Sequence, residues 1–318
     1  MSILTNELIN GLFDAEFFEY VPCNLCGAVD TDILYDADVQ RIPKRRNDLI
    51  SIYSSSSNRI CYEQVLRCRK CGLIYLSPRP KRQIIIHSYS CAEDTKYISQ
   101  EKERQLTFKR CLKTIKHLCS EGSLLDIGAA CGIFVKTAVD AGYKAIGVEP
   151  SVWMCEFAKK QYNVTILPTV VEDAKFKDSS FDIVTMWDVL EHVPDPMCTL
   201  KEVKRILKPG GILVINYPRI DDPLAKIFGR HWWFLLSIHL FYFTHKTLSS
   251  YLEYVGFEPI LHKMYIQTLA YGYLVERLKA YSPGLAKIAQ VPYVIPEFRR
   301  LLIPYFASQY LMVAKRRK

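Results

Sequence analysis

Two pairs of cysteines have the spacing of metal ligands. Cys23 and Cys26 form one Cys-x-x-Cys pair, Cys68 and Cys71 form a second, and a glycine follows each pair. Four thiolates in two such knuckles suit tetrahedral Zn²⁺, and the glycine eases the tight turn. The gap of roughly 40 residues between the pairs exceeds the usual zinc pattern, and a redox function is the competing interpretation. Two copies in one loop-rich region favour a structural zinc ion, because a four-cysteine site leaves no open position for a substrate.

A turn from Asp126 to Gly132 has residue types that suit a ligand-binding loop. Asp126 closes an apolar stretch, and Gly128 and Gly132 frame the turn. Glycine lets the backbone approach a ligand and leaves amide donors at a helix start. Glu149 ends the next apolar stretch about 20 residues further on, where an acid can accept both hydroxyls of a ribose. Together these residues predict a ribose-containing ligand.

The elements that position these residues follow an α/β pattern. From residue 123 onward, apolar strands alternate with amphipathic helices, which is typical of a parallel sheet covered on both faces. Ligands of such doubly wound sheets bind beyond the carboxyl ends of the strands. Ser151 is a predicted N-cap. We expect strands at 123–127, 143–149, 164–167, 181–187, 212–217, 257–266 and 309–314, with helices at 132–141, 151–161, 200–207 and 246–255.

Four motifs in order make this region similar to class I S-adenosylmethionine-dependent methyltransferases. The turn at 126–132 resembles the family's first motif, and Glu149 its ribose-binding acid. Residues 171–182 resemble the adenine-side loop, and 187–195 followed by 207–211 resemble the later motifs. The resemblance covers about residues 120–262 and the last strand. It implies a Rossmann-like sheet, S-adenosylmethionine as cofactor, and methyl transfer.

The same resemblance implies a set of cofactor-binding residues. Ala130 stands where the family often has a glycine. Its neighbours Ala129 and Cys131 are also small, so we expect the loop to admit the methionine portion of the cofactor, although the extra methyl group narrows the space. The predicted set is Asp126, Gly128, Ala130, Gly132, Glu149, Pro150, Val171, Glu172, Trp187 and Asp188.

The N-terminal region carries a second resemblance. Residues 71–80 resemble the end of the zinc-binding module that precedes the methyltransferase core in one bacterial branch. Members of that branch act on sugars, natural products and cell-surface precursors. The resemblance therefore implies a structural zinc ion on Cys23, Cys26, Cys68 and Cys71.

Two histidines are candidates for the general base. Methyl transfer is an in-line displacement, so the enzyme mainly aligns the partners, but an oxygen or carbon nucleophile must also lose its proton. His239 lies after the fifth predicted strand, in a stretch that resembles the one carrying the base in the zinc-module branch. The sugar C-methyltransferases of that branch have an acid just before this histidine, whereas this chain has Ile238, which argues against C-methylation. His192 follows the fourth strand and faces the same crevice; a third alternative is that neither histidine is the base.

The composition divides the chain into three parts. We expect a zinc-binding module over 1–90, a polar helical connector over 91–119 and a methyltransferase domain over 120–318. Within that domain, 217–245 and 263–304 are predicted insertions on the substrate side. The second is rich in Tyr, Leu and Arg, and we expect it to be helical and to cover the acceptor pocket. Its basic, aromatic composition would also suit peripheral contact with a membrane.

The net charge of +9 is unevenly distributed. Basic clusters suit an anionic partner such as a nucleotide-linked or lipid-linked small-molecule acceptor, or nucleic acid; the alternative is a solvated surface. Nucleic acid is the less favoured partner, because aromatic residues that could stack on bases are not interleaved with the basic ones. The clusters lie at 41–46, 67–70, 81–82 and 315–318.

The remaining sequence features bear on location and function. Eleven cysteines, no secretory signal and no apolar run of roughly 18 residues predict a cytoplasmic protein. The favoured function is methyl transfer to an O- or N-nucleophile of a sugar, cell-surface precursor or other small metabolite. The alternatives are a nucleic-acid-binding or RNA-modifying methyltransferase, a sugar C-methyltransferase and a non-catalytic cofactor binder.

Overall fold

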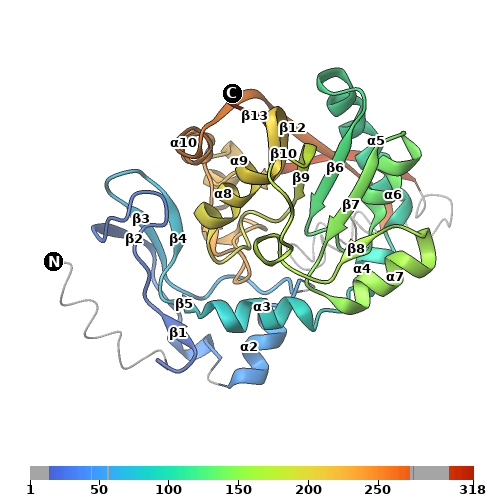
Figure 1. The fold of residues 1–318 in the computed structure, drawn as a ribbon. Coiled ribbons are helices and arrows are strands. Elements are labelled where there is room, and N and C mark those ends of the chain that lie inside the picture. The colour runs from blue at the N-terminus through green and yellow to red at the C-terminus, as the bar shows by residue number, and fades with distance from the viewer. Residues whose placement is uncertain (1–13, 44, 56, 273–274, 276–300) are drawn as a thin grey trace.

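A seven-stranded mixed sheet forms the centre of the computed structural model, which describes residues 14–43, 45–55, 57–272, 275 and 301–318 (Figure 1). The strand order is β12-β13-β10-β9-β6-β7-β8. The five strands from β10 to β8 are parallel, β13 runs antiparallel to β10, and β12 runs antiparallel to β13. The predicted Rossmann-like sheet is therefore confirmed. The strands are β6 (Ser123–Ile127), β7 (Lys144–Val148), β8 (Ile166–Leu167), β9 (Phe181–Trp187), β10 (Leu207–Pro218), β12 (Phe257–Ala270) and β13 (Leu302–Arg316).

Helices cover both faces of this sheet. Successive strand residues point to opposite faces, so Leu124 packs into one apolar cluster and Leu125 into the other. The cluster that contains Leu124 includes side chains of α5 (Glu101–Leu118), α6 (Ile133–Asp140) and α7 (Val152–Tyr162). The second includes those of α8 (Pro196–Ile206) and α10 (His245–Val255). The sheet thus has the two covered faces that the alternation of apolar strands and amphipathic helices predicted.

Local signals in the sequence were partly correct. The Ser151 hydroxyl accepts a hydrogen bond from the Met154 amide over 3.2 Å, which confirms the predicted N-cap of α7. The helix predicted at 200–207 ends at Ile206, and residues 208–211 after it lie inside β10 as an irregularity in its pairing with β9. The pairing slips between Leu207 and Ile212, so the Pro-Gly-Gly stretch bulges without ending the strand.

The N-terminal region forms its own small sheet, with strand order β11-β4-β3-β2. Its strands β2 (Thr31–Tyr35), β3 (Val65–Cys68) and β4 (Ile74–Leu76) precede the core, whereas β11 (Phe241–Tyr242) follows β10. Residues 217–245, predicted as a substrate-side insertion, therefore also complete the N-terminal sheet. This segment carries α9 (Pro223–Phe228) and the short turn η3 (Gly229–His231) as well as β11.

A buried polar cluster links the N-terminal region to the same segment. The Glu63 carboxylate is fully buried and accepts hydrogen bonds from Arg59 (2.9 Å), Tyr53 (2.9 Å) and Ser237 (2.7 Å). Because Ser237 lies two residues before His239, this cluster helps to fix the loop that carries the candidate base.

Short helices connect the N-terminal region to the core. β1 (Phe18–Glu19) pairs with β5 (Arg79–Pro80), and α3 (Arg82–Ser90) follows directly. The predicted connector contains α4 (Thr95–Ile98) and α5, and α5 packs against β12 and α6 as part of the core. The other short elements are η1 (Val39–Arg41), α2 (Arg46–Ile52) and η2 (Val171–Asp173).

The predicted helical insertion at 263–304 is wrong at both ends. β12 continues to Ala270 and β13 begins at Leu302, because the two strands pair over nearly their whole length. Residues 273–274 and 276–300 lie outside the described residues, and with them most of the predicted insertion. Among the described helices, none is long and apolar enough to cross a membrane.

Candidate functional site

A cavity of about 350 Å³ lies beyond the carboxyl ends of the parallel strands. Eight of the ten predicted cofactor residues line it, as do both candidate bases, His192 and His239. The eight are Gly128, Ala130, Glu149, Pro150, Val171, Glu172, Trp187 and Asp188.

The turn after β6 presents its backbone to this cavity. Gly128 has φ +68°, and a Cβ at this position would lie 2.5 Å from the Val189 side chain, so only glycine fits. Ala130 also has a left-handed backbone, with φ +44°. This conformation favours glycine, which gives a physical reason for the glycine that the family often has there.

Glu149 closes the turn from the end of β7. Its Oε2 accepts a hydrogen bond from the Ala130 amide and its Oε1 one from the Ser151 amide, each over 3.1 Å. Burial raises the pKa of this carboxyl to about 7, against the opposing effect of the two amides. Each carboxylate oxygen has a further lone pair, so the group can accept two more hydrogen bonds, as a ribose diol would require.

The other two predicted cofactor residues do not line the cavity. Asp126 is buried behind the turn, where its Oδ1 accepts a hydrogen bond from Thr185 over 2.6 Å, and burial raises its pKa well above the usual value. Gly132 starts α6, and its backbone packs against Ala158. Both residues therefore shape the turn from outside the cavity.

Two further parts of the wall come from the loop after β8 and from the end of β9 with the residue that follows it. Glu172, in η2, accepts a hydrogen bond from Thr199 over 2.5 Å. Trp187 stacks on Tyr265 with ring centroids 6.1 Å apart. Asp188 also has a left-handed backbone, and its carboxylate accepts hydrogen bonds from Asn216 (2.8 Å) and Gln309.

The two candidate bases face each other. The ring centroids of His192 and His239 lie 4.6 Å apart. Burial lowers the pKa of His192 to about 4; burial and the nearby His192 lower that of His239 well below its usual value. Both rings are therefore neutral near pH 7 and can accept a proton.

The sequence interpretation missed Glu191, which the structure brings to the same two histidines. A carboxylate oxygen of Glu191 and a ring nitrogen of each histidine all lie within 4.8 Å of one another. Its position immediately before His192 and after an apolar stretch was the available signal. Gln267, Tyr305 and Gln309 also line the cavity, but they come from β12 and β13, and no motif marked them.

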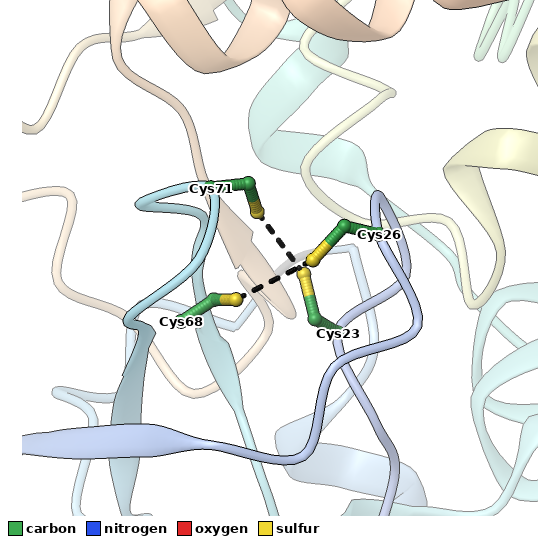
Figure 2. Close-up of side chains that lie close together, drawn as sticks. All are labelled: Cys23, Cys26, Cys68 and Cys71. Atoms are coloured by element: carbon green, nitrogen blue, oxygen red, sulfur yellow. Dashed lines mark hydrogen bonds between the residues drawn. The ribbon is translucent and has the colours of Figure 1, made fainter.

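The four predicted zinc ligands form one cluster (Figure 2). Cys23 Sγ lies 3.3 Å from Cys71 Sγ, and Cys26 Sγ lies 3.5 Å from Cys68 Sγ. Four thiolates bound to zinc at about 2.3 Å in a tetrahedron lie about 3.8 Å apart, so the cluster is close to the required size. It is a candidate zinc site by geometry and donor chemistry.

The two knuckles have the same backbone hydrogen bonds. The Gly27 amide donates to Cys23 O over 2.8 Å, and the Gly72 amide donates to Cys68 O over 2.9 Å. Both glycines have positive φ. Both pairs thus turn in the same way, as the matching Cys-x-x-Cys-Gly pattern predicts.

One knuckle contacts the α/β core through Asn24. Its side chain donates to Asp195 (2.9 Å) and accepts from the Met197 amide (3.1 Å) and the Tyr251 hydroxyl (3.0 Å). Asp195 and Met197 lie at the start of α8, whereas Tyr251 lies in α10. These hydrogen bonds attach the first knuckle to the core.

Comparisons with known proteins agree with this architecture. The sequence model of a family described as "Methyltransferase domain" matches residues 94–262, more than half of the chain. The ubiquinone biosynthesis O-methyltransferase of Haemophilus ducreyi is 33% identical over 103 residues, 29% of this chain and 44% of that protein. The tRNA U34 carboxymethyltransferase of Cellvibrio japonicus is 31% identical over 164 residues, 46% of this chain and 49% of that protein. The chain spans about half the length of these relatives.

A solved structure with a related sequence comes from Thermotoga maritima. It is described as a methyltransferase and possible histamine N-methyltransferase, and it is 25% identical, with a TM-score of 0.46, over 70% of this chain and 94% of that one. The family match covers α4 to the first part of β12 and includes most of the residues that line the cavity. The chain belongs to the methyltransferase-domain family.

Proposed function

We propose that the chain methylates an oxygen or nitrogen nucleophile of a small metabolite, such as a sugar or a cell-surface precursor. The single observation that carries this proposal is that one cavity contains both Glu149, which can accept hydrogen bonds from ribose hydroxyls, and the pair His192 and His239. Glu149 suits the ribose of the cofactor, and the histidine pair suits a methyl acceptor that loses a proton.

The cofactor lies on the side of the cavity formed by the β6 turn. Glu149 accepts its ribose hydroxyls, the backbone at Gly128 and Ala130 allows close approach, and Val171 with Glu172 borders the adenine. Trp187 and Asp188 complete this wall. The sulfonium methyl then points toward the acceptor, and the enzyme lowers the barrier mainly by alignment.

The acceptor lies beside the histidines. During transfer the carbon–sulfur bond breaks, a bond forms between the methyl carbon and the acceptor atom, and the electron pair stays on sulfur as S-adenosylhomocysteine. A neutral His239 or His192 receives the acceptor's proton. Ile238 occupies the position where sugar C-methyltransferases of the zinc-module branch carry an acid, so oxygen and nitrogen nucleophiles are favoured over carbon.

A small acceptor is favoured over nucleic acid because arginines of two basic clusters form ion pairs with acidic side chains. Arg69 forms ion pairs with Asp30 (3.1 Å) and Asp32 (2.6 Å), and Arg41 with Asp38 (3.3 Å). These acids reduce the positive field that a polyanion would require.

The N-terminal region supports the core through a structural zinc ion on Cys23, Cys26, Cys68 and Cys71. A four-cysteine site offers no open position, so the ion stabilises the fold and takes no part in methyl transfer.

Transfer of a radiolabelled methyl group tests the proposed function. The full chain is incubated with labelled S-adenosylmethionine and a panel of sugars, nucleotide-linked sugars, amines, phenols and bulk RNA. We expect label in a small hydroxyl or amine compound. Label in RNA alone, or cofactor binding without transfer to any acceptor, would contradict it.

A further inference from the structure

Three side chains at the acceptor end of the cavity have the arrangement of a metal-binding triad. Glu191 and His192 follow β9, and His239 lies in the loop before β11. One ligand atom from each lies within 4.8 Å of the other two, and all three residues line the cavity. Two imidazoles and one carboxylate on one side of a cavity leave the other side open for a substrate.

Backbone carbonyls hold both histidine rings through Nδ1. His192 Nδ1 lies 3.0 Å from Ile238 O, and His239 Nδ1 lies 2.7 Å from Phe234 O. Because a carbonyl only accepts, each Nδ1 carries the hydrogen, and each Nε2 keeps its lone pair. Histidines that bind metals are held in this way, with one ring nitrogen donating to a carbonyl or carboxylate.

The Glu191 carboxylate provides an independent sign of a ligand. Glu191 is buried, and its Oε2 has no hydrogen-bond partner among the described residues. A buried carboxylate oxygen without a partner is costly and calls for an explanation, such as an ion. Nearby Asp188 is different, since Asn216 and Gln309 both donate to its carboxylate.

We propose that Glu191, His192 and His239 bind a divalent transition-metal ion of the Mn²⁺, Fe²⁺ or Zn²⁺ type, which in turn binds a hydroxyl oxygen of the acceptor. This inference rests on the proposed function, narrows the acceptor to compounds with a hydroxyl group, and assigns the acceptor's proton to water in place of a histidine. Mixed nitrogen and oxygen ligands suit these ions, and a hard oxygen of the substrate fills an open position.

The ion changes how the acceptor proton is removed. Coordination lowers the pKa of the hydroxyl, so its proton leaves to water and the metal-bound alkoxide attacks the methyl carbon. The carbon–sulfur bond breaks as the carbon–oxygen bond forms, and the products are the methyl ether, S-adenosylhomocysteine and one proton. With the ion bound, the two Nε2 atoms are ligands and not bases.

Binding of Mn²⁺, measured by the loss of the free-ion electron paramagnetic resonance signal, tests the site without any acceptor. The full chain is used with its cysteine-bound zinc in place, since thiolates favour zinc over Mn²⁺. We expect one Mn²⁺ per chain, with affinity at least tenfold lower in Glu191→Gln and in His239→Gln. His231→Gln, which changes an exposed histidine outside the cavity, is the matched control and keeps the wild-type affinity.

Calorimetry with S-adenosylhomocysteine accompanies each titration and shows that the variants fold. The metal site is overturned if wild-type protein takes up no Mn²⁺ at millimolar concentration, or if folded Glu191→Gln binds it as tightly as wild type. The catalytic role of the metal is also overturned if a hydroxyl acceptor is methylated at full rate after a chelator has removed metal from this site and left one zinc per chain. Mn²⁺ uptake that depends on Glu191 supports the metal site even if no acceptor is methylated. The absence of methylation would then contradict only the proposed function.

Discussion

The Ala130 amide donates a hydrogen bond to Oε2 of Glu149 over 3.1 Å, and so joins the turn after β6 to the end of β7. The two residues are nineteen positions apart, yet the parallel pairing of β6 and β7 brings them to the same edge of the sheet. The bond aligns the left-handed turn with the carboxylate, so the surface proposed for the cofactor's ribose and methionine portions is already formed.

The pH dependence of cofactor binding follows from Glu149. Its pKa is raised to about 7, and the ionised form is the better acceptor for two hydroxyls. We therefore expect cofactor affinity to rise by about tenfold from pH 6 to pH 8, following the ionised fraction. Calorimetry across this range checks it, with Glu149→Gln as the control for titration of the cofactor's own amine; an equal rise in that variant would contradict the role.

The same shift predicts an effect on stability. A carboxyl whose pKa is raised on folding binds its proton more tightly in the native state. Its contribution to the free energy of unfolding is therefore fully present below the unfolded pKa of 4.5 and is lost as pH rises toward about 7. We expect Glu149→Gln to remove this part of the decline in the free energy of unfolding between pH 5 and pH 7. Urea denaturation at both pH values, with wild type alongside, gives the comparison; an unchanged decline would show that other groups cause it.

Removal of one zinc ligand tests the cysteine cluster. Cys26→Ser should lose the metal and lower the melting temperature, because three thiolates hold zinc less well than four and the knuckles then lack their crosslink. Elemental analysis should give about one zinc per chain in wild type and less in the variant. Cys198→Ser, at an exposed cysteine outside the cluster, should keep the metal; a folded wild type without metal would rule out the zinc site.

Substitution of Asn24 tests the docking of the first knuckle on the core separately from metal binding. Asn24→Ala removes three hydrogen bonds to Asp195, Met197 and Tyr251. At roughly 1 kcal/mol for each bond, less some relaxation, the free energy of unfolding should fall by about 2 kcal/mol with zinc content unchanged. Asn47→Ala, at an exposed position in α2, should not destabilise the chain; equal losses in both variants would contradict the docking role.

The sequence predicted the core of the fold well because local periodicity and long-range structure agree there. Apolar strands such as 123–127 and 181–187 can be read without knowing their partners, and the acid at 149 was found from its distance to the glycine turn. Asp126 was placed in the cofactor set by its position in the motif, although its side chain turns away to Thr185. A motif fixes where a residue lies along the chain, whereas the direction of its side chain depends on packing.

Other parts of the site could not be predicted, since they depend on pairing between distant segments. β11 joins the N-terminal sheet through Tyr242 and Ile74, which are far apart in sequence, and this pairing helps to position the loop of His239. Gln309 reaches Asp188 only because β13 inserts between β10 and β12. Glu191 was visible in the sequence, but only the folded structure shows that its Oε2 has no hydrogen-bond partner among the described residues.

Titration of S-adenosylmethionine into wild-type protein and into Glu149→Ala, measured by calorimetry, tests the central claim most directly. We expect one site per chain in wild type and an affinity more than tenfold lower in the variant, or about 1.4 kcal/mol, because two ribose hydroxyls lose their acceptor. Glu156→Ala, at an exposed acid in α7, should bind like wild type. Equal affinity in wild type and Glu149→Ala, or no binding to wild type, would contradict the account.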